Sequence, residues 1–162
     1  MSILKVKNIV VEDFINYRKP SMFICTCTCT FKCCKEAGVS IDICQNSPTY
    51  KAETVDIPDD KIVNLYRYNH ITKAIVFGGL EPLDQFDEVF NLIRELRDIT
   101  NDDIVIYTGY NKDEIEDKIN LLKLFDNIII KYGRYIPNDA SRFDTVLGVI
   151  LASSNQYAEK IS

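Results

Sequence analysis

The stretch Ala74-Ile75-Val76-Phe77-Gly78-Gly79-Leu80-Glu81-Pro82 (residues 74–82) joins a continuous apolar run to a glycine-rich turn. A short apolar run that ends at turn residues is typical of a strand buried on both faces. Gly78 and Gly79 lack a Cβ, so a turn at this point can leave backbone N–H and C=O groups open to a ligand. The stretch therefore predicts a buried strand that ends at a binding edge.

Similar apolar runs rich in β-branched residues recur along the 162-residue chain, at residues 22–24, 104–107, 128–130 and 147–151. Segments with helical periodicity lie between several of these runs. One follows Asp84, a candidate N-cap, and shorter segments follow Asp59 and Asp113. Apolar strands that alternate with amphipathic helices indicate a parallel sheet covered by helices. We therefore expect an α/β fold. The apolar positions of the segment after Asp84 are Phe86, Val89, Phe90, Ile93 and Leu96.

Polar and small residues follow each apolar run, where parallel strands of this fold class bind ligands. Taken singly, each of these motifs is typical of an ordinary loop or cap, but all are expected at one edge of the sheet. Glu81 offers a carboxylate for an ammonium group, and Lys131 offers the opposite charge for a carboxylate. A small zwitterion fits both. The motifs are Gly78-Gly79-Leu80-Glu81-Pro82, Tyr107-Thr108-Gly109-Tyr110, Lys131-Tyr132-Gly133-Arg134 and Ser153-Ser154-Asn155-Gln156.

All six cysteines lie between residues 25 and 44, directly after the first apolar run. Disulfides are disfavoured because the sequence shows no signal peptide, and neighbours such as Cys33 and Cys34 would close very short loops. Inert buried thiols explain single cysteines but not six in one loop. The single histidine, His70, lies far downstream, so a Cys/His zinc site has little support. Thiolate ligands alone favour an iron–sulfur cluster.

Three cysteine ligands would leave one iron of a four-iron cluster open for a substrate or cofactor. Cys29, Cys33 and Cys44 are the best candidates, because three residues separate the first two and Cys44 opens Cys-Gln-Asn. Cys27 or Cys34 could instead take a place in this trio, since spacing alone does not decide between them.

Composition narrows the class of protein further. The net charge of −5 and the absence of a basic cluster disfavour binding to nucleic acid. The sequence shows no signal peptide and no apolar stretch of about 18 residues, so we expect a cytoplasmic protein. Length and the 46% hydrophobic content predict a single domain over residues 1–162, with a cysteine-rich cluster loop at 25–46.

The order and spacing of these motifs resemble the radical S-adenosylmethionine superfamily and, within it, the activating proteins of anaerobic ribonucleoside-triphosphate reductases. The resemblance runs from about Asn16 to Gln156, and its most specific parts are residues 78–85, 107–110 and 153–156. It implies a partial, open β/α barrel that holds a [4Fe-4S] cluster and S-adenosylmethionine. The cofactor-binding residues that it implies are Gly78, Gly79, Glu81, Thr108, Lys131 and Ser154, with Cys29, Cys33 and Cys44 as cluster ligands.

The resemblance also implies a reaction. The reduced cluster would cleave S-adenosylmethionine, and the resulting 5′-deoxyadenosyl radical would take a hydrogen atom from a glycine of the reductase catalytic subunit. No catalytic side chain is expected beyond the cluster and cofactor site. A separate electron donor such as flavodoxin is expected, because the chain has no room for a second cluster domain.

The cysteine spacing departs from the C-x3-C-x2-C pattern of this superfamily, since ten residues separate Cys33 from Cys44. We interpret residues 34–43 as an insertion, because loop-closure entropy grows slowly with length. Three alternatives stay open: activation of another glycyl-radical enzyme, action on a small molecule, and a non-catalytic zinc or iron–sulfur module.

Overall fold

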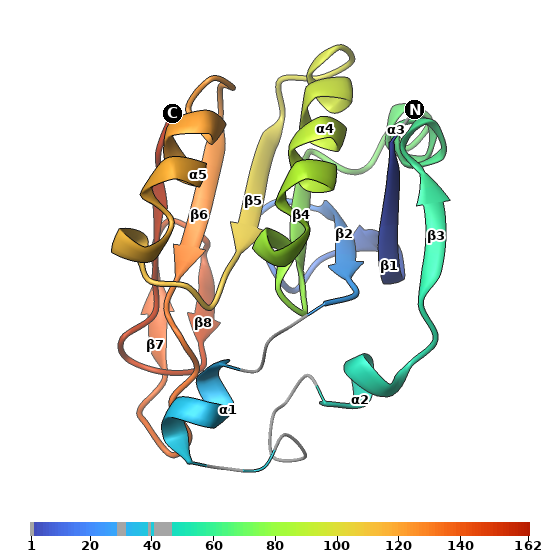
Figure 1. Cartoon of the computed structure of the whole chain (residues 1–162). Helices are drawn as coiled ribbons and strands as arrows, with labels where there is room; N and C mark the ends of the chain where they lie inside the picture. The colour runs from blue at the N-terminus through green and yellow to red at the C-terminus, as the bar shows by residue number, and fades with distance from the viewer. Residues whose placement is uncertain (1, 29–31, 39, 41–46) are drawn as a thin grey trace.

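The computed structural model describes residues 2–28, 32–38, 40 and 47–162. Seven strands form one sheet in the order β3-β1-β2-β4-β5-β6-β9 (Figure 1). Its four central strands are parallel, and helices follow several of them, so the predicted α/β fold is confirmed. The central strands are β2 (Ser21–Thr26), β4 (Ala74–Gly79), β5 (Asp103–Tyr107) and β6 (Ile128–Tyr132).

Both outer parts of the sheet are antiparallel. The long strand β1 (Ile3–Asp13) pairs with β2 on one side and with β3 (Val55–Pro58) on the other. At the opposite edge, β9 (Tyr157–Lys160) pairs with β6. The four parallel strands are therefore enclosed between antiparallel edges.

The apolar run at residues 147–151 differs from our expectation of a parallel strand. Its strand β8 (Val149–Leu151) pairs antiparallel with β7 (Arg142–Asp144) in a separate two-stranded sheet. The cause is a tight turn between the two strands. Gly148 adopts φ +72°, and its N–H donates to the Asp144 carbonyl over 2.8 Å. A left-handed residue at this point reverses the chain.

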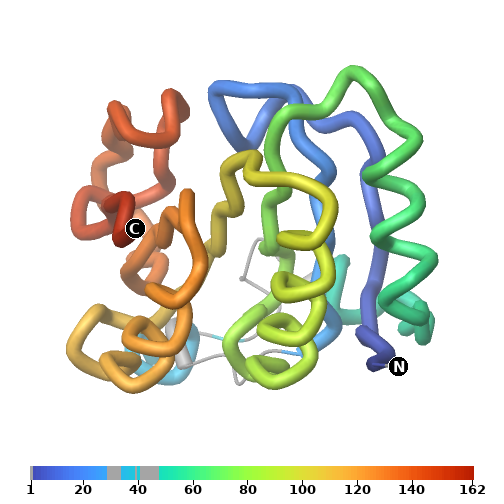
Figure 2. Tube along the Cα trace, turned by 90° about the horizontal axis from the view of Figure 1, so that it is seen from above, coloured from blue at the N-terminus to red at the C-terminus, as the bar shows by residue number. Residues whose placement is uncertain are grey.

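Helices cover one face of the main sheet. Strand side chains alternate, so Ile75 and Phe77 pack under the helices while Ala74 and Val76 belong to a smaller core on the other face. The β7–β8 hairpin lies on that second face, away from α4 and α5 (Figure 2). The three covering helices are α3 (Asp59–Arg67), α4 (Phe86–Arg97) and α5 (Glu116–Leu122).

The predicted helix starts are displaced by a few residues. Asp84 is not the N-cap of α4, because Pro82 begins a 3-10 turn, η2 (Pro82–Gln85), and α4 starts only after it. The Asp84 carboxylate instead accepts a 2.7 Å hydrogen bond from the Tyr110 hydroxyl. Asp59 lies in the first turn of α3 and Pro58 occupies its N-cap. A second 3-10 turn, η3 (Lys112–Glu114), precedes α5.

Two short helices, α1 (Lys32–Ala37) and α2 (Ser47–Lys51), lie beyond the carboxyl ends of the parallel strands (Figure 1). The polypeptide thus returns to this edge directly after β2 and again before β3. Among the described residues, no helix has the length and apolar character needed to cross a lipid bilayer.

Candidate functional site

The carboxyl ends of β2, β4, β5 and β6 meet at one edge of the sheet, which we call the rim. Thr26 pairs with Gly79 across β2 and β4, and Tyr107 pairs with Lys131 across β5 and β6. Because neighbouring parallel strands end in register here, the motifs that follow them in the sequence are brought together. Five of the six expected cofactor-binding residues lie at the rim: Gly78, Gly79, Glu81, Thr108 and Lys131.

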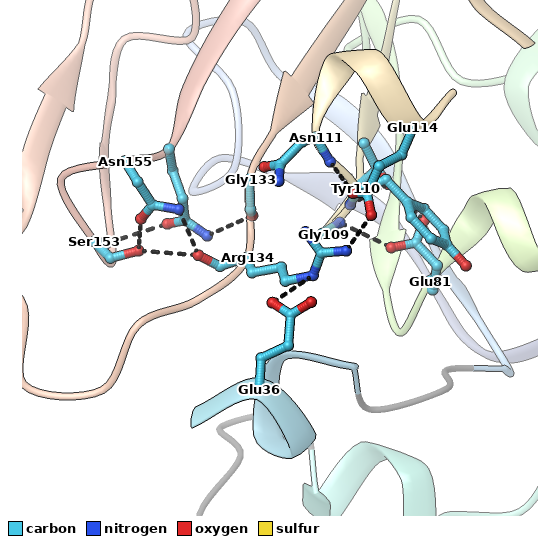
Figure 3. A network of polar contacts seen from close by, with 12 residues as sticks. Glu36, Glu81, Gly109, Tyr110, Asn111, Glu114, Gly133, Arg134, Ser153 and Asn155 are labelled. Carbon is cyan, nitrogen blue, oxygen red and sulfur yellow. Dashed lines mark hydrogen bonds and ion pairs between the residues drawn. The ribbon is translucent and has the colours of Figure 1, made fainter. Parts of the chain in front are cut away.

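Glu81 joins the end of β4 to the end of β5. Its buried carboxylate accepts hydrogen bonds from the Thr108 hydroxyl (2.8 Å) and the Leu83 N–H (3.1 Å). It also accepts a hydrogen bond from the Gly109 N–H (2.8 Å; Figure 3). Its backbone N–H donates to the Thr28 carbonyl over 2.6 Å, at the start of the cysteine loop. Burial raises the pKa of Glu81 to about 7, against the effect of these hydrogen bonds. The side chain thus fixes the positions of two strand exits, and the backbone N–H fixes Thr28 after β2.

Gly79 has no space for a side chain. Its φ of +82° lies in the left-handed region, and an added Cβ would come within 2.1 Å of Cys25 Sγ. The Cys25 thiol therefore fills the space that Gly79 leaves, which gives it a packing role in β2. Burial raises the pKa of Cys25 and of Cys27, and this favours their neutral thiols.

Lys131 places a buried positive charge between the ends of β5 and β6. Its Nζ donates to the carbonyls of Thr108 (3.4 Å) and Gly133 (3.3 Å) and lies 5.8 Å from the centre of the Tyr107 ring. A buried ammonium is stabilised strongly by an anion. The position suits recognition of a ligand carboxylate.

Arg134 follows β6 and connects several parts of the rim (Figure 3). Its Nη2 lies 2.5 Å from Glu114 Oε1, and its Nε lies 3.0 Å from Glu36 Oε2 of α1. Its carbonyl accepts a 2.8 Å hydrogen bond from Asn155 Nδ2. The guanidinium therefore links η3 to α1, and the backbone carbonyl of Arg134 binds the loop after β8.

The serine pair after β8 is divided between the interior and the surface. Ser153 is buried, and its hydroxyl donates to the Asn155 side chain (2.7 Å) and to the Arg134 carbonyl (3.4 Å). The expected cofactor residue Ser154 is exposed, and its hydroxyl and N–H donate to Asp139 at 2.6 and 2.9 Å. Of the two serines, Ser153 is the one that contacts the residues of the rim.

The expected cluster ligands cannot be placed in the same way. Cys29 and Cys44 lie outside the described residues, and of Cys33 the structure describes the backbone, in α1. Cys25, Cys27 and Cys34 are buried. No group of three potential metal ligands occurs among the side chains that the structure describes. The described segments β2 and α1, which flank part of the cysteine stretch in the sequence, both reach the rim.

The chain thus combines an α/β rim with a cysteine-rich stretch of sequence at residues 25–44. The profile of the family described as "4Fe-4S single cluster domain" matches residues 19–157, which is most of the chain. The chain belongs to this family. The match supports a [4Fe-4S] cluster and is consistent with an iron–sulfur protein of the radical S-adenosylmethionine type. A search of curated proteins found no match.

Proposed function

We propose that the protein is a radical S-adenosylmethionine enzyme that activates an anaerobic ribonucleotide reductase by forming a glycyl radical on its catalytic subunit. The single observation that carries this proposal is the match of residues 19–157 to a [4Fe-4S] family. The rim carries the glycine turn at the end of β4 and the buried Lys131 of β6, and both support a second cofactor site of the kind that such chemistry requires. In this proposal, the helix-covered sheet is an open β/α barrel.

In this proposal, Cys29, Cys33 and Cys44 hold the cluster. When bound, the cluster would supply the electron for reductive cleavage of the sulfonium of S-adenosylmethionine. The electron comes from a separate donor such as flavodoxin. Cleavage would yield methionine and a 5′-deoxyadenosyl radical, and this radical would take a hydrogen atom from the partner glycine to give 5′-deoxyadenosine.

The residues of the chain bind and orient the cofactor. The Lys131 ammonium attracts the carboxylate of the methionine portion, while the backbone at Gly78 and Gly79 accommodates its amino group. Glu81 and Thr108 hold the two strand exits at a fixed separation through their 2.8 Å hydrogen bond. Ser154, exposed beside Asp139, is assigned to the outer margin of the cofactor site.

Anaerobic reconstitution tests this proposal directly. We expect iron and sulfide close to four each per chain, an electron paramagnetic resonance spectrum that changes when S-adenosylmethionine is added, and 5′-deoxyadenosine as a product. Replacement of Cys29, Cys33 or Cys44 by serine should abolish the cluster. Cys25→Ser is the matched control, because its thiol packs against Gly79, and it should retain iron.

The partner is tested separately. Addition of the catalytic subunit of an anaerobic ribonucleotide reductase should give a glycyl radical signal on that subunit. A signal obtained only with another glycyl-radical enzyme would change the assigned partner but keep the reaction class. Bound zinc without iron after anoxic purification would contradict the enzyme itself and favour a non-catalytic metal module.

A further inference from the structure

An ion pair fastens α1 to the end of β6. Glu36 Oε2 lies 3.0 Å from Arg134 Nε, although the two residues are far apart in the sequence (Figure 3). The helix α1 spans six residues, Lys32–Ala37. A helix this short is not stable by itself in water, so its position depends on contacts with the rest of the protein.

The Arg134 side of this contact is rigid. Arg134 is 8% exposed, and its second carboxylate partner, Glu114, is itself fixed because its other oxygen accepts the Asn111 N–H over 2.8 Å. The Arg134 carbonyl accepts the Asn155 side-chain N–H, which fixes the backbone as well. The Glu36 side chain, by contrast, is 53% exposed. Arg134 is therefore a preformed anchor, and Glu36 is the partner that brings α1 to it.

The anchored helix carries part of the cysteine stretch. Cys33 lies in α1, three residues before Glu36 and so about one helical turn away. A contact that fixes Glu36 also fixes the helix backbone at Cys33. The planar guanidinium suits this task because its fork can bind two carboxylates at once, which a lysine ammonium does not reproduce in the same geometry.

We propose that Arg134 is a positioning residue for the cluster: through Glu36 it holds α1, and with it the backbone of Cys33, against the carboxyl edge of the parallel strands. This inference rests on the proposed function in one respect, because it takes Cys33 to be a cluster ligand. Its consequence is that the ion pair slows loss of iron from the cluster without contacting the cluster.

Two matched variants test this inference. Glu36→Gln and Glu114→Gln each remove one carboxylate from the same guanidinium, but only Glu36 lies on α1. The reconstituted proteins are exposed to an iron chelator under anoxic conditions, and the decay of cluster absorbance is followed. We expect Glu36→Gln to release iron about two- to fivefold faster than wild type, the range of a partly exposed ion pair. Glu114→Gln keeps an amide oxygen that can accept from the Arg134 guanidinium, so it should release iron more slowly than Glu36→Gln.

Two further measurements separate positioning from general stabilisation. High salt should speed iron release in wild type and leave Glu36→Gln nearly unchanged, because only the former has the ion pair to screen. In the protein without iron, trypsin should cut at Lys35 within α1 faster in Glu36→Gln than in Glu114→Gln. Arg134→Lys should resemble Glu36→Gln in both measurements.

The outcomes are distinguishable. Equal iron release in wild type and Glu36→Gln, or equal acceleration in Glu36→Gln and Glu114→Gln, would overturn the positioning role while the proposed function stands. A wild-type protein that takes up no iron would contradict the proposed function, and the role of Arg134 toward a cluster would fall with it.

Discussion

The two ends of the parallel strands hold buried carboxylates in opposite ways. At the amino end, Asp103 begins β5 and accepts hydrogen bonds from Lys19 (2.7 Å) and Tyr17 (2.8 Å). Burial opposes ionisation of Asp103, but these two donors outweigh it and its pKa is lowered. At the carboxyl end, the groups that donate to Glu81 are uncharged, and burial raises its pKa to about 7. The carboxylate at the amino end is thus paired with a cation. The carboxylate at the carboxyl end has uncharged hydrogen-bond donors, and its ionisation costs stability.

This difference indicates where the fold gives up stability for function. Perturbed carboxylates and left-handed backbone are typical of binding sites, because surrounding structure must hold them in place. Gly79 and Glu81 combine both features within one turn. We therefore expect substitutions at the rim to have larger effects than equivalent substitutions at the amino end.

Gly79→Ala should have the largest effect. Its Cβ would meet Cys25 Sγ at 2.1 Å and the Cys25 backbone at 3.1 Å, and alanine is strained at φ +82°. Overpacking and left-handed strain together predict a loss of about 3–5 kcal/mol in the free energy of unfolding, measured by denaturant titration.

Gly38→Ala is the matched control for this change. Gly38 has a similar φ of +66°, but nothing lies within 4 Å of an added Cβ, so a loss of only about 1 kcal/mol is expected. The double variant Cys25→Ala, Gly79→Ala should recover part of the loss by removing the sulfur. Equal losses in the two glycine variants would show that the packing of Cys25 against Gly79 is unimportant.

Glu81→Gln should have the next largest effect, and it should depend on pH. Because the folded-state pKa of Glu81 is raised from 4.5 to about 7, its stabilising contribution is complete below pH 4.5 and is lost as the pH rises through 7. A rise of that size corresponds to about 3 kcal/mol. The wild-type melting temperature should therefore fall between pH 5 and pH 8, and that of Glu81→Gln should change less.

The control for Glu81 is an exposed carboxylate. Glu53→Gln removes the same charge from the surface and should keep the pH dependence of the wild type. If the stability of the wild type does not fall between pH 5 and pH 8, the raised pKa of Glu81 is contradicted.

Much of this arrangement was open to prediction from local patterns. The apolar runs identified the four parallel strands, and the residues after them identified the rim, because strand direction fixes where those residues meet. Helical periodicity gave the buried face of α4 through Val89, Ile93 and Leu96. The antiparallel edges were missed. In β1, Leu4 and Val6 alternate with exposed residues, a period-two pattern that indicates a strand but not its partner.

The remaining features depend on tertiary contacts that composition does not encode. Ser153 and Ser154 have the same side chain, and only the turn after β8 decides that Ser153 faces inward. Glu36 and Arg134 form an ion pair although several strands separate them in the sequence. In neither case does a local pattern distinguish the functional contact from an ordinary polar residue.

Asp103→Asn should have the smallest effect and the opposite dependence on pH. Because the folded-state pKa of Asp103 is lowered, its contribution is present above the unfolded value of 3.8 and is lost as the pH falls through the folded pKa. We expect a loss of about 1–2 kcal/mol at pH 7, since Lys19 is partly exposed and only the Tyr17 bond is buried. In acid, the variant and the wild type should converge.

Lys19→Met separates the two donors to Asp103. It removes the exposed cation but keeps the buried Tyr17 hydroxyl, so its loss at pH 7 should be smaller than that of Asp103→Asn. Thermal unfolding at pH 3 and pH 7 measures the loss of stability in the Lys19→Met and Asp103→Asn variants. If Asp103→Asn and Glu81→Gln responded to pH in the same direction, the contrast between the two ends of the sheet would be wrong. Opposite responses would instead show that the carboxylate without a charged donor is Glu81, at the carboxyl end of the strands.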